Sequence, residues 1–148
     1  MPSNDLKYLA RSFDPSSTVL FFGAGSSISS HAPSTEKLIA HLSKEFGQTT
    51  EGFTLAEVTE LIERKSKDRK RLIASIRTLF QHLEPTRGLL TVPLYDWKSI
   101  YTTNYDELVE DAYRRRGANL TVYDSNFDFT VKGKSLTTKL YKLHGTIS

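Results

Sequence analysis

The segment that decides the fold runs from Thr18 to Ser27 and has the sequence TVLFFGAGSS. Its first five residues form a short apolar run, which is typical of a strand that a parallel sheet buries on both faces. The run leads directly into Gly23-Ala24-Gly25-Ser26. Glycines allow a tight turn and a close approach of the backbone to a phosphate, whose charge free N–H groups can bind. Taken alone, a plain tight turn explains the segment equally well.

A second segment with polar side chains follows a strand predicted over residues Ile100–Thr103. It contains Asn104 and Asp106, whose donors and acceptors can hold ribose hydroxyls or an amide. The alternative is a local role. Asn104 would then cap a helix predicted from about Tyr105 to Arg116, and Glu107 would complete a capping box. The local pattern by itself favours the cap.

A third segment, His144-Gly145, ends a strand predicted over residues Leu136–Leu143, and another strand is predicted at Leu120–Tyr123. Histidine is the commonest general base, because its unperturbed pKa of about 6.5 lies near physiological pH. A lone histidine is more often not catalytic. This segment therefore indicates a functional site only in combination with the other two. The glycine beside the histidine would leave room for a ligand.

Helical patterns fill the intervals between these strands. A helix is predicted from Ser34 to Gly47, and Thr54 with Glu57 forms a capping-box pattern. The region of about residues 50–85 is predicted to be a helical layer or insertion of two helices. Together the elements predict an α/β fold, a Rossmann-like parallel sheet with flanking helices and a helical insertion. Ligands of such sheets bind outside the carboxyl ends of the strands, where all three segments lie.

Composition narrows the class of protein. The chain has 148 residues, 38% of them hydrophobic and 25% charged, as expected for one soluble domain or a large part of one. Membrane insertion is not expected, because no apolar run reaches the roughly 20 residues that a membrane-spanning helix needs. The first residues do not resemble a secretory signal, so we expect a cytoplasmic protein. The absence of cysteine excludes disulfides, thiolate zinc sites and a cysteine nucleophile.

The net charge of +3 is mild, and much of it comes from the stretch Arg64–Arg71, RKSKDRKR. We interpret this stretch as a solvated helix face or loop. A contact with nucleic acid or an acidic partner is the alternative. No aromatic residue interleaves the stretch, so it does not support a base-stacking platform for nucleic acid.

Taken together, the three segments resemble the SIR2 family, in which a Gly-Ala-Gly-Ser loop, an Asn-x-Asp motif and a His-Gly pair follow strands in this order. The residues 102–110, TTNYDELVE, are similar to the SIR2-like domains of bacterial defence proteins rather than to protein deacylases. The resemblance spans most of the chain, from about Thr18 to Gly145.

The resemblance implies an NAD site, with NAD as substrate and no metal. The loop would lie against the pyrophosphate, and Asn104 and Asp106 would surround the nicotinamide and its ribose. The catalytic residues implied are His144, as a base or a ribose-holding group, and Asn104. The NAD-binding residues implied are Gly23, Ala24, Gly25, Ser26, Ser27, Pro33, Thr103, Asn104, Asp106 and Gly145. The bond broken would join ribose to nicotinamide, through a transition state resembling an oxocarbenium ion.

Three departures from the family weigh against a deacylase. Its four-cysteine zinc module is impossible here. Its Asp-Phe-Arg segment is replaced by His31–Glu36, in which only Pro33 matches, and its usual glutamine before the asparagine is Thr103. We therefore expect an NAD glycohydrolase, with a role as effector of antiphage defence by analogy only. A sensor that binds NAD or ADP-ribose without turnover is the alternative, and a deacylase is a third.

In the family the sheet continues past the His-Gly strand, whereas this chain has three residues after Gly145. The resemblance therefore implies that residues 1–148 are the N-terminal portion of a SIR2-like NAD-binding domain, with a sheet that is incomplete at its C-terminal side. Further C-terminal domains or a partner chain would complete it, and a homo-oligomer is a further alternative.

Overall fold

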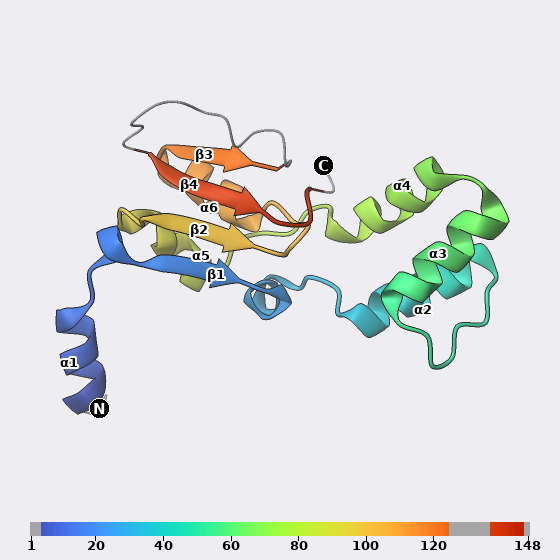
Figure 1. Cartoon of the computed structure of the whole chain (residues 1–148), viewed down its shortest axis with the longest axis horizontal. Coiled ribbons are helices and arrows are strands. Elements are labelled where there is room, and N and C mark those ends of the chain that lie inside the picture. Colours follow the sequence, from blue (N-terminus) through green and yellow to red (C-terminus); the bar gives the residue numbers. More distant parts are fainter. Residues whose placement is uncertain (1–3, 125–136, 147–148) are drawn as a thin grey trace.

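The computed structural model describes residues 4–124 and 137–146. Within them, four strands form one parallel sheet in the order β1-β2-β4-β3 (Figure 1). The strands are β1 Val19–Phe22, β2 Ser99–Thr102, β3 Leu120–Tyr123 and β4 Thr138–Lys142. This arrangement confirms the predicted α/β, Rossmann-like fold. The last residues of β1, β2 and β4 are paired in register, so these three strands end level with one another.

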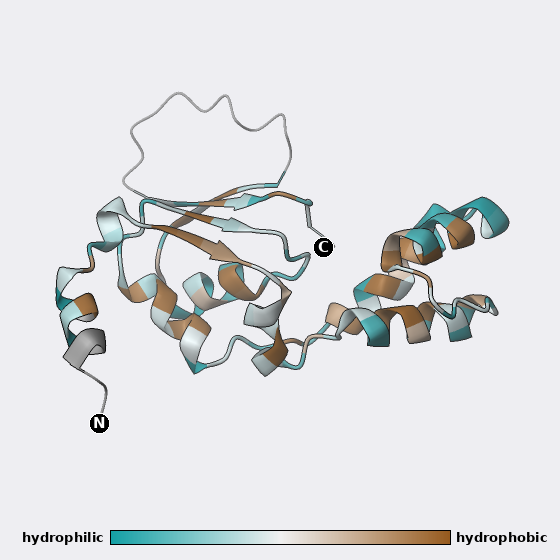
Figure 2. Ribbon diagram, turned by 60° about the horizontal axis from the view of Figure 1, so that its bottom comes forward, coloured by the Kyte–Doolittle hydropathy of each residue, from teal (hydrophilic) through white to brown (hydrophobic). Residues whose placement is uncertain are grey.

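One face of the sheet is covered by α5 (Arg87–Thr91) and α6 (Leu108–Arg116), which lie on the same side of the strands in Figure 2. Ile100 and Leu140 lie fully buried at the centre of this face and pack against both helices. Burying such a side chain contributes about 1.5–3 kcal/mol. This core therefore anchors the two strands that deliver the second and third sequence segments.

The other face of the sheet is less covered than the sequence predicted. The TVLFF strand was expected to be covered on both faces, but β1 is an edge strand on which Val19 is 48% and Phe21 63% exposed. Across the sheet from Phe21, Tyr101 and Tyr123 both stack on Tyr141, with ring centroids 4.7 and 5.0 Å apart. The expectation is wrong because, among the described residues, the helices flank one face only.

A group of three helices lies beyond the carboxyl ends of the strands and is called the helical lobe below (Figure 1). It consists of α2 (Thr35–Phe46), α3 (Leu55–Ser66) and α4 (Arg69–Phe80). Its buried core is formed by Leu42, Val58, Ile62 and Leu72. The helices α3 and α4 lie within the predicted region of residues 50–85, and α2 packs with them.

The ends of the lobe helices follow the local sequence patterns. Ser34 accepts a hydrogen bond from the Lys37 N–H at the start of α2, and Gly47 ends that helix in the left-handed conformation. Thr54 and Glu57 form both hydrogen bonds of a capping box at the start of α3. These helix ends confirm the sequence prediction.

The remaining described elements are short. Helix α1 (Asn4–Ser12) precedes the sheet, and three 3₁₀ turns lie at Pro15–Ser17, Ala24–Ser30 and Val92–Leu94. The predicted strand at Leu136–Leu143 corresponds to β4, and its residue 136 lies outside the described residues. None of the helices in the described ranges is long and apolar enough to cross a membrane.

Candidate functional site

The three polar segments meet at the carboxyl edge of the sheet. Since the strands end level, the loop after each strand starts beside the next one. The Thr103 N–H donates to the Phe22 carbonyl at 3.2 Å, and the Leu143 N–H donates to the Thr102 carbonyl at 2.9 Å. The structure therefore places the loops beginning at Gly23, Thr103 and Leu143 side by side, as the rule for parallel sheets predicts.

The first loop turns immediately after β1. Gly23 leads into the 3₁₀ turn Ala24–Ser30, and its carbonyl accepts from both the N–H and the hydroxyl of Ser26, at 2.9 and 2.8 Å. Neither Gly23 nor Gly25 has a positive φ. A Cβ built on either one would meet no atom within 4 Å. Neither the backbone conformation nor the packing within the described residues requires glycine here, and the space over both residues is open.

Asn104 points into this first loop rather than toward α6. Its amide nitrogen lies 3.1 Å from the Gly23 carbonyl, 3.1 Å from the Ser26 hydroxyl and 2.9 Å from the Ser27 hydroxyl. The interpretation of Asn104 as a helix cap is therefore wrong, because a contact with a loop about 80 residues away replaces the local one. Among the described residues, no group donates to the Asn104 Oδ1, which remains available as an acceptor.

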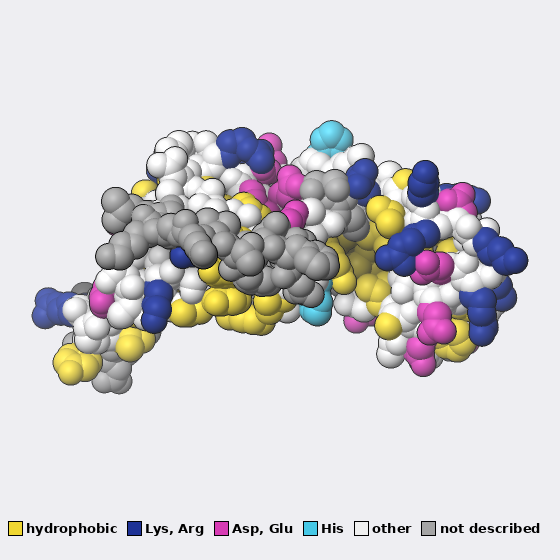
Figure 3. All heavy atoms as spheres, turned by 45° about the horizontal axis from the view of Figure 1, so that its top comes forward, with side chains coloured by type: hydrophobic (Ala, Val, Ile, Leu, Met, Phe, Trp, Pro, Cys, Tyr) yellow, Lys and Arg dark blue, Asp and Glu magenta, His cyan; other side chains and the backbone are white. Residues whose placement is uncertain are grey.

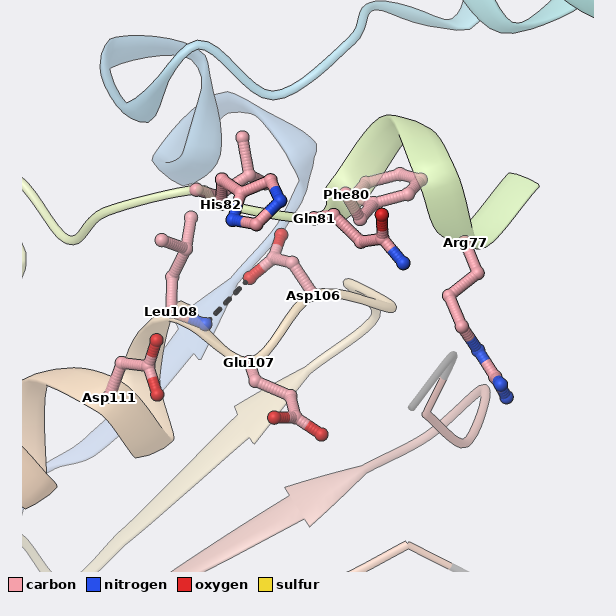
Figure 4. Close-up of a pocket in the computed structure, with 9 residues that line it drawn as sticks. Arg77, Phe80, Gln81, His82, Asp106, Glu107, Leu108 and Asp111 are labelled. Atoms are coloured by element: carbon pink, nitrogen blue, oxygen red, sulfur yellow. Dashed lines mark hydrogen bonds between the residues drawn. The ribbon is translucent and has the colours of Figure 1, made fainter. Parts of the chain in front are cut away.

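Asp106 is buried between the first loop and α6. Its Oδ2 accepts from the Ser27 hydroxyl at 2.7 Å, and its Oδ1 accepts from the Leu108 N–H at 3.1 Å (Figure 4). The second contact explains why α6 begins at Leu108 and not at Tyr105, as the sequence predicted. Asp106 thus fixes both the start of a helix and the position of Ser27.

His144 is exposed at the end of β4. Its ring centroid lies 6.2 Å from that of Tyr105, and it has no hydrogen-bond partner in the part of the chain that the structure describes. Gly145 has a φ of +77°, a conformation that other residues adopt only with strain. The glycine is therefore required by the turn itself, a reason that the sequence interpretation of ligand space did not include.

The most buried charged group at this edge, Lys142, was not singled out by the sequence interpretation. Its side chain is 1% exposed and lies 2.9 Å from the Glu110 carboxylate. Burial raises the pKa of Glu110 above its ordinary value, and the charge of Lys142 opposes that rise. The alternation of inward-facing and outward-facing residues along β4 could have revealed this buried charge. Lys142 lies on the same inward face as Leu140, and a buried lysine needs a partner.

Two adjoining clefts separate these segments from the helical lobe. The first, of about 320 Å³, is lined by six of the predicted NAD-binding residues, Ala24, Ser27, Pro33, Thr103, Asn104 and Asp106. The predicted residues Gly23, Gly25, Ser26 and Gly145 do not line it. His144 lines the second cleft, of about 340 Å³, with apolar lobe side chains such as Leu55 and Ile76. Both clefts are bordered by Leu38, Leu55, Phe80 and Tyr105.

A third cleft, of about 280 Å³, lies between the end of α4 and the start of α6. Figure 4 shows Phe80 and His82 on one side of it and Asp106, Glu107 and Asp111 on the other. Asp106 therefore borders two clefts. Within the described ranges, no three His, Asp or Glu side chains are grouped so that they could hold a metal ion.

The basic stretch lies in the helical lobe, and of its residues Arg69 lines the cleft that contains His144. All residues from Arg64 to Arg71 are exposed, and Figure 3 shows Lys and Arg side chains over the lobe. Arg69 and Arg71 pair with Glu63 and Glu45. This exposure agrees with the interpretation as a solvated surface.

The family model of the SIR2-like domain matches residues 98–148, which include β2, α6, β3, β4 and the Asn104 and His144 segments. The chain is thus similar to SIR2-like domains, which use NAD, over this part of its length, and the similarity suggests an NAD-related function. No curated protein matches the sequence.

Proposed function

We propose that this chain binds NAD at the carboxyl edge of the sheet and hydrolyses it to nicotinamide and ADP-ribose. One observation carries the proposal. Ser27 and Asp106, both buried, and the half-buried Asn104 form a hydrogen-bond network between the loops that follow β1 and β2. The Asn104 Oδ1 and the His144 ring have no hydrogen-bond partner in the described residues. An acceptor and an imidazole are thus both available to a ligand, which supports the proposal.

The first loop supports a phosphate-binding role. Glycine at positions 23 and 25 is not required by φ, nor by contacts of a Cβ with the described residues. Open space over a glycine backbone lets an anion approach the N–H groups closely. We therefore assign the NAD pyrophosphate to this loop, and the nicotinamide ribose to the cleft bordered by Asn104 and Asp106.

The chemistry requires little beyond positioning and charge. The bond between the ribose and the nicotinamide nitrogen breaks with its electron pair going to the nicotinamide, which leaves as a neutral molecule. Water adds to the ribose carbon, and His144 accepts the proton or holds a ribose hydroxyl. The carboxylate of Asp106 and the Asn104 Oδ1 supply negative potential near the developing positive charge.

A second candidate, an NAD-dependent protein deacylase, is favoured by one observation. Aliphatic and aromatic side chains of the helical lobe form half of the lining of the cleft that contains His144, beside the charged Glu63 and Arg69, and this apolar part suits an acyl chain. We also propose a role in antiphage defence, from the resemblance of residues 102–110 to bacterial defence proteins. A cytoplasmic location is proposed because the first residues do not resemble a secretory signal. The open edge of β1 supports a further strand there, from this polypeptide or from a partner.

The test is nicotinamide release from NAD by the purified chain, alone and within any longer natural polypeptide that contains it. His144→Ala is expected to lower the rate by about 10²–10⁴-fold, the usual contribution of a general base. His41→Ala is the matched control, since His41 lies in α2 and pairs with Ser75 and Glu45.

Three other results would change the assignment. Release that requires an acylated peptide supports the deacylase. A thermal shift with NAD but no release from either polypeptide supports a sensor. If NAD neither shifts the melting temperature nor is consumed, the proposed site is wrong.

A further inference from the structure

Lys142 lies beneath the candidate site, where a charge is costly. It is the last residue of β4, in register with Thr102, and its side chain points toward the face covered by helices. Only 1% of that side chain is exposed. A buried ammonium group is tolerated only when its hydrogens are all engaged, because removing it from water is expensive.

The three hydrogens of the ammonium group reach three different parts of the chain. Lys142 Nζ lies 2.7 Å from the main-chain carbonyl of Asp106, 2.9 Å from the carboxylate of Glu110 and 3.3 Å from the hydroxyl of Thr146. These partners lie in the loop after β2, in α6 and just beyond His144. A lysine has three donors, so this set satisfies all of them.

The network continues from Asp106 into the first loop. The carboxylate of Asp106 accepts from Ser27, and the Ser27 hydroxyl accepts from Asn104. Lys142 therefore adds a side-chain link between the His144 segment and the two other segments, beside the main-chain bond from the Leu143 N–H to the Thr102 carbonyl. Within the turn itself, the Gly145 N–H donates to the Lys142 carbonyl at 3.3 Å.

We infer that Lys142 is a positioning residue for the proposed NAD hydrolysis. Its ammonium group holds Asp106 and Thr146 at one point, and so, together with the Leu143–Thr102 main-chain bond, sets the position of His144 relative to the Asn104–Asp106 loop. Lys142 itself touches no reacting atom. The catalytic part of this inference rests on the proposed function, whereas the structural link does not.

A second substitution at Glu110 separates the positioning role of Lys142 from its contribution to stability. Lys142→Met alone leaves the Glu110 carboxylate buried without its partner, which destabilises the fold. The double variant Lys142→Met/Glu110→Gln removes both charges, so the fold is retained. The Asp106 carbonyl and the Thr146 hydroxyl still lose their donor. Lys139→Met is the matched control, because Lys139 lies on the same strand and faces the opposite side of the sheet.

The experiment measures kcat and KM for nicotinamide release, together with amide hydrogen exchange at Gly145 and Leu108. We expect the double variant to melt near the wild-type temperature, to keep its KM, and to lose about a hundredfold in kcat. Exchange at both amides should accelerate, while the Thr103 amide, bonded to Phe22, stays protected. A folded double variant with wild-type kcat and exchange overturns the inference.

A rescue experiment uses the absence of cysteine from the chain. Lys142→Cys can be alkylated in the unfolded state with 2-bromoethylamine, which rebuilds a lysine-like ammonium group, and then refolded beside refolded wild type. Recovery of kcat and of exchange protection supports the inference, and a refolded product without recovery contradicts it. If the wild type releases no nicotinamide, the proposed function fails, and exchange at Gly145 and Leu108 still decides the role of Lys142.

Discussion

The helical lobe and the strand-end site are built in opposite ways. The lobe has an apolar core around Leu42 and Ile62, and its helices are capped by residues three or four positions away. The site has a buried polar core, in which Asn104 and Asp106 bind a loop that lies 77 to 81 residues earlier in the chain.

Because of this difference, we expect substitutions in the two regions to have different effects on stability and on activity. Apolar contacts are nondirectional, so loss of one lowers stability in proportion to the area and cavity involved. A satisfied polar network is directional, and loss of one partner leaves the others buried and unpaired. We therefore expect substitutions in the lobe to affect mainly unfolding, and substitutions in the site to affect mainly chemistry.

The largest effect on stability is expected for Leu42→Ala in the lobe. Leu42 is fully buried, so its truncation should cost about 2–5 kcal/mol in the free energy of unfolding, including the cavity left behind. Urea unfolding followed by circular dichroism measures this loss. Ile73→Ala, at an exposed position of α4, is the control and should cost much less.

Hydrogen exchange of the same Leu42 variant tests whether the two regions are separate. We expect the Thr103 and Leu108 amides to stay protected, because their acceptors lie outside the lobe. Parallel loss of protection at these amides and in the lobe would show instead that both regions unfold as one cooperative unit.

A smaller effect on stability and a larger one on activity are expected for Asn104→Ala. The variant removes the donor to Gly23, Ser26 and Ser27, which should cost about 1–3 kcal/mol. Nicotinamide release should fall by about 10²–10³-fold, as when a positioned polar group is lost from an active site. Asn119→Ala, on the exposed surface, is the control. If activity instead fell only as far as the loss of stability explains, as expected for a lobe variant, the site and the lobe would not differ in this respect.

The smallest effect is expected for Glu57→Gln in the capping box. The hydrogen bond from the Thr54 N–H lowers the pKa of Glu57 below its ordinary value of 4.5. A lowered folded-state pKa contributes stability that is present above the unfolded value and is lost as pH falls through the folded one. The variant should therefore be less stable than wild type at neutral pH, and the difference should vanish in acid.

Thermal melts between about pH 3 and pH 7 measure this pH dependence. Glu60→Gln is the control, because Glu60 is equally exposed on the same helix but lies outside the capping box. If the Glu57 variant loses stability equally at every pH, ionisation of Glu57 does not contribute through the cap.

The contrast also explains which sequence predictions succeeded. The cap at Ser34, the glycine stop at Gly47 and the Thr54–Glu57 box depend on residues a few positions apart, so a local pattern was sufficient. The local cap predicted for Asn104 failed because a partner about 80 residues away satisfied its amide instead. Both faces of β1 were predicted to be buried, and one is open, since a pattern of apolar residues does not say what packs against them.

The sequence by itself determined the parallel α/β order, the helices of the lobe and the strand ends where the polar segments lie. These follow from hydrophobic periodicity, capping and glycine placement, which act over a few residues. Only the tertiary structure decided that Asn104 binds the glycine loop, that Asp106 binds Ser27 and that Lys142 joins the segments. These contacts depend on strand order and register, which bring distant residues within hydrogen-bonding distance where water is excluded.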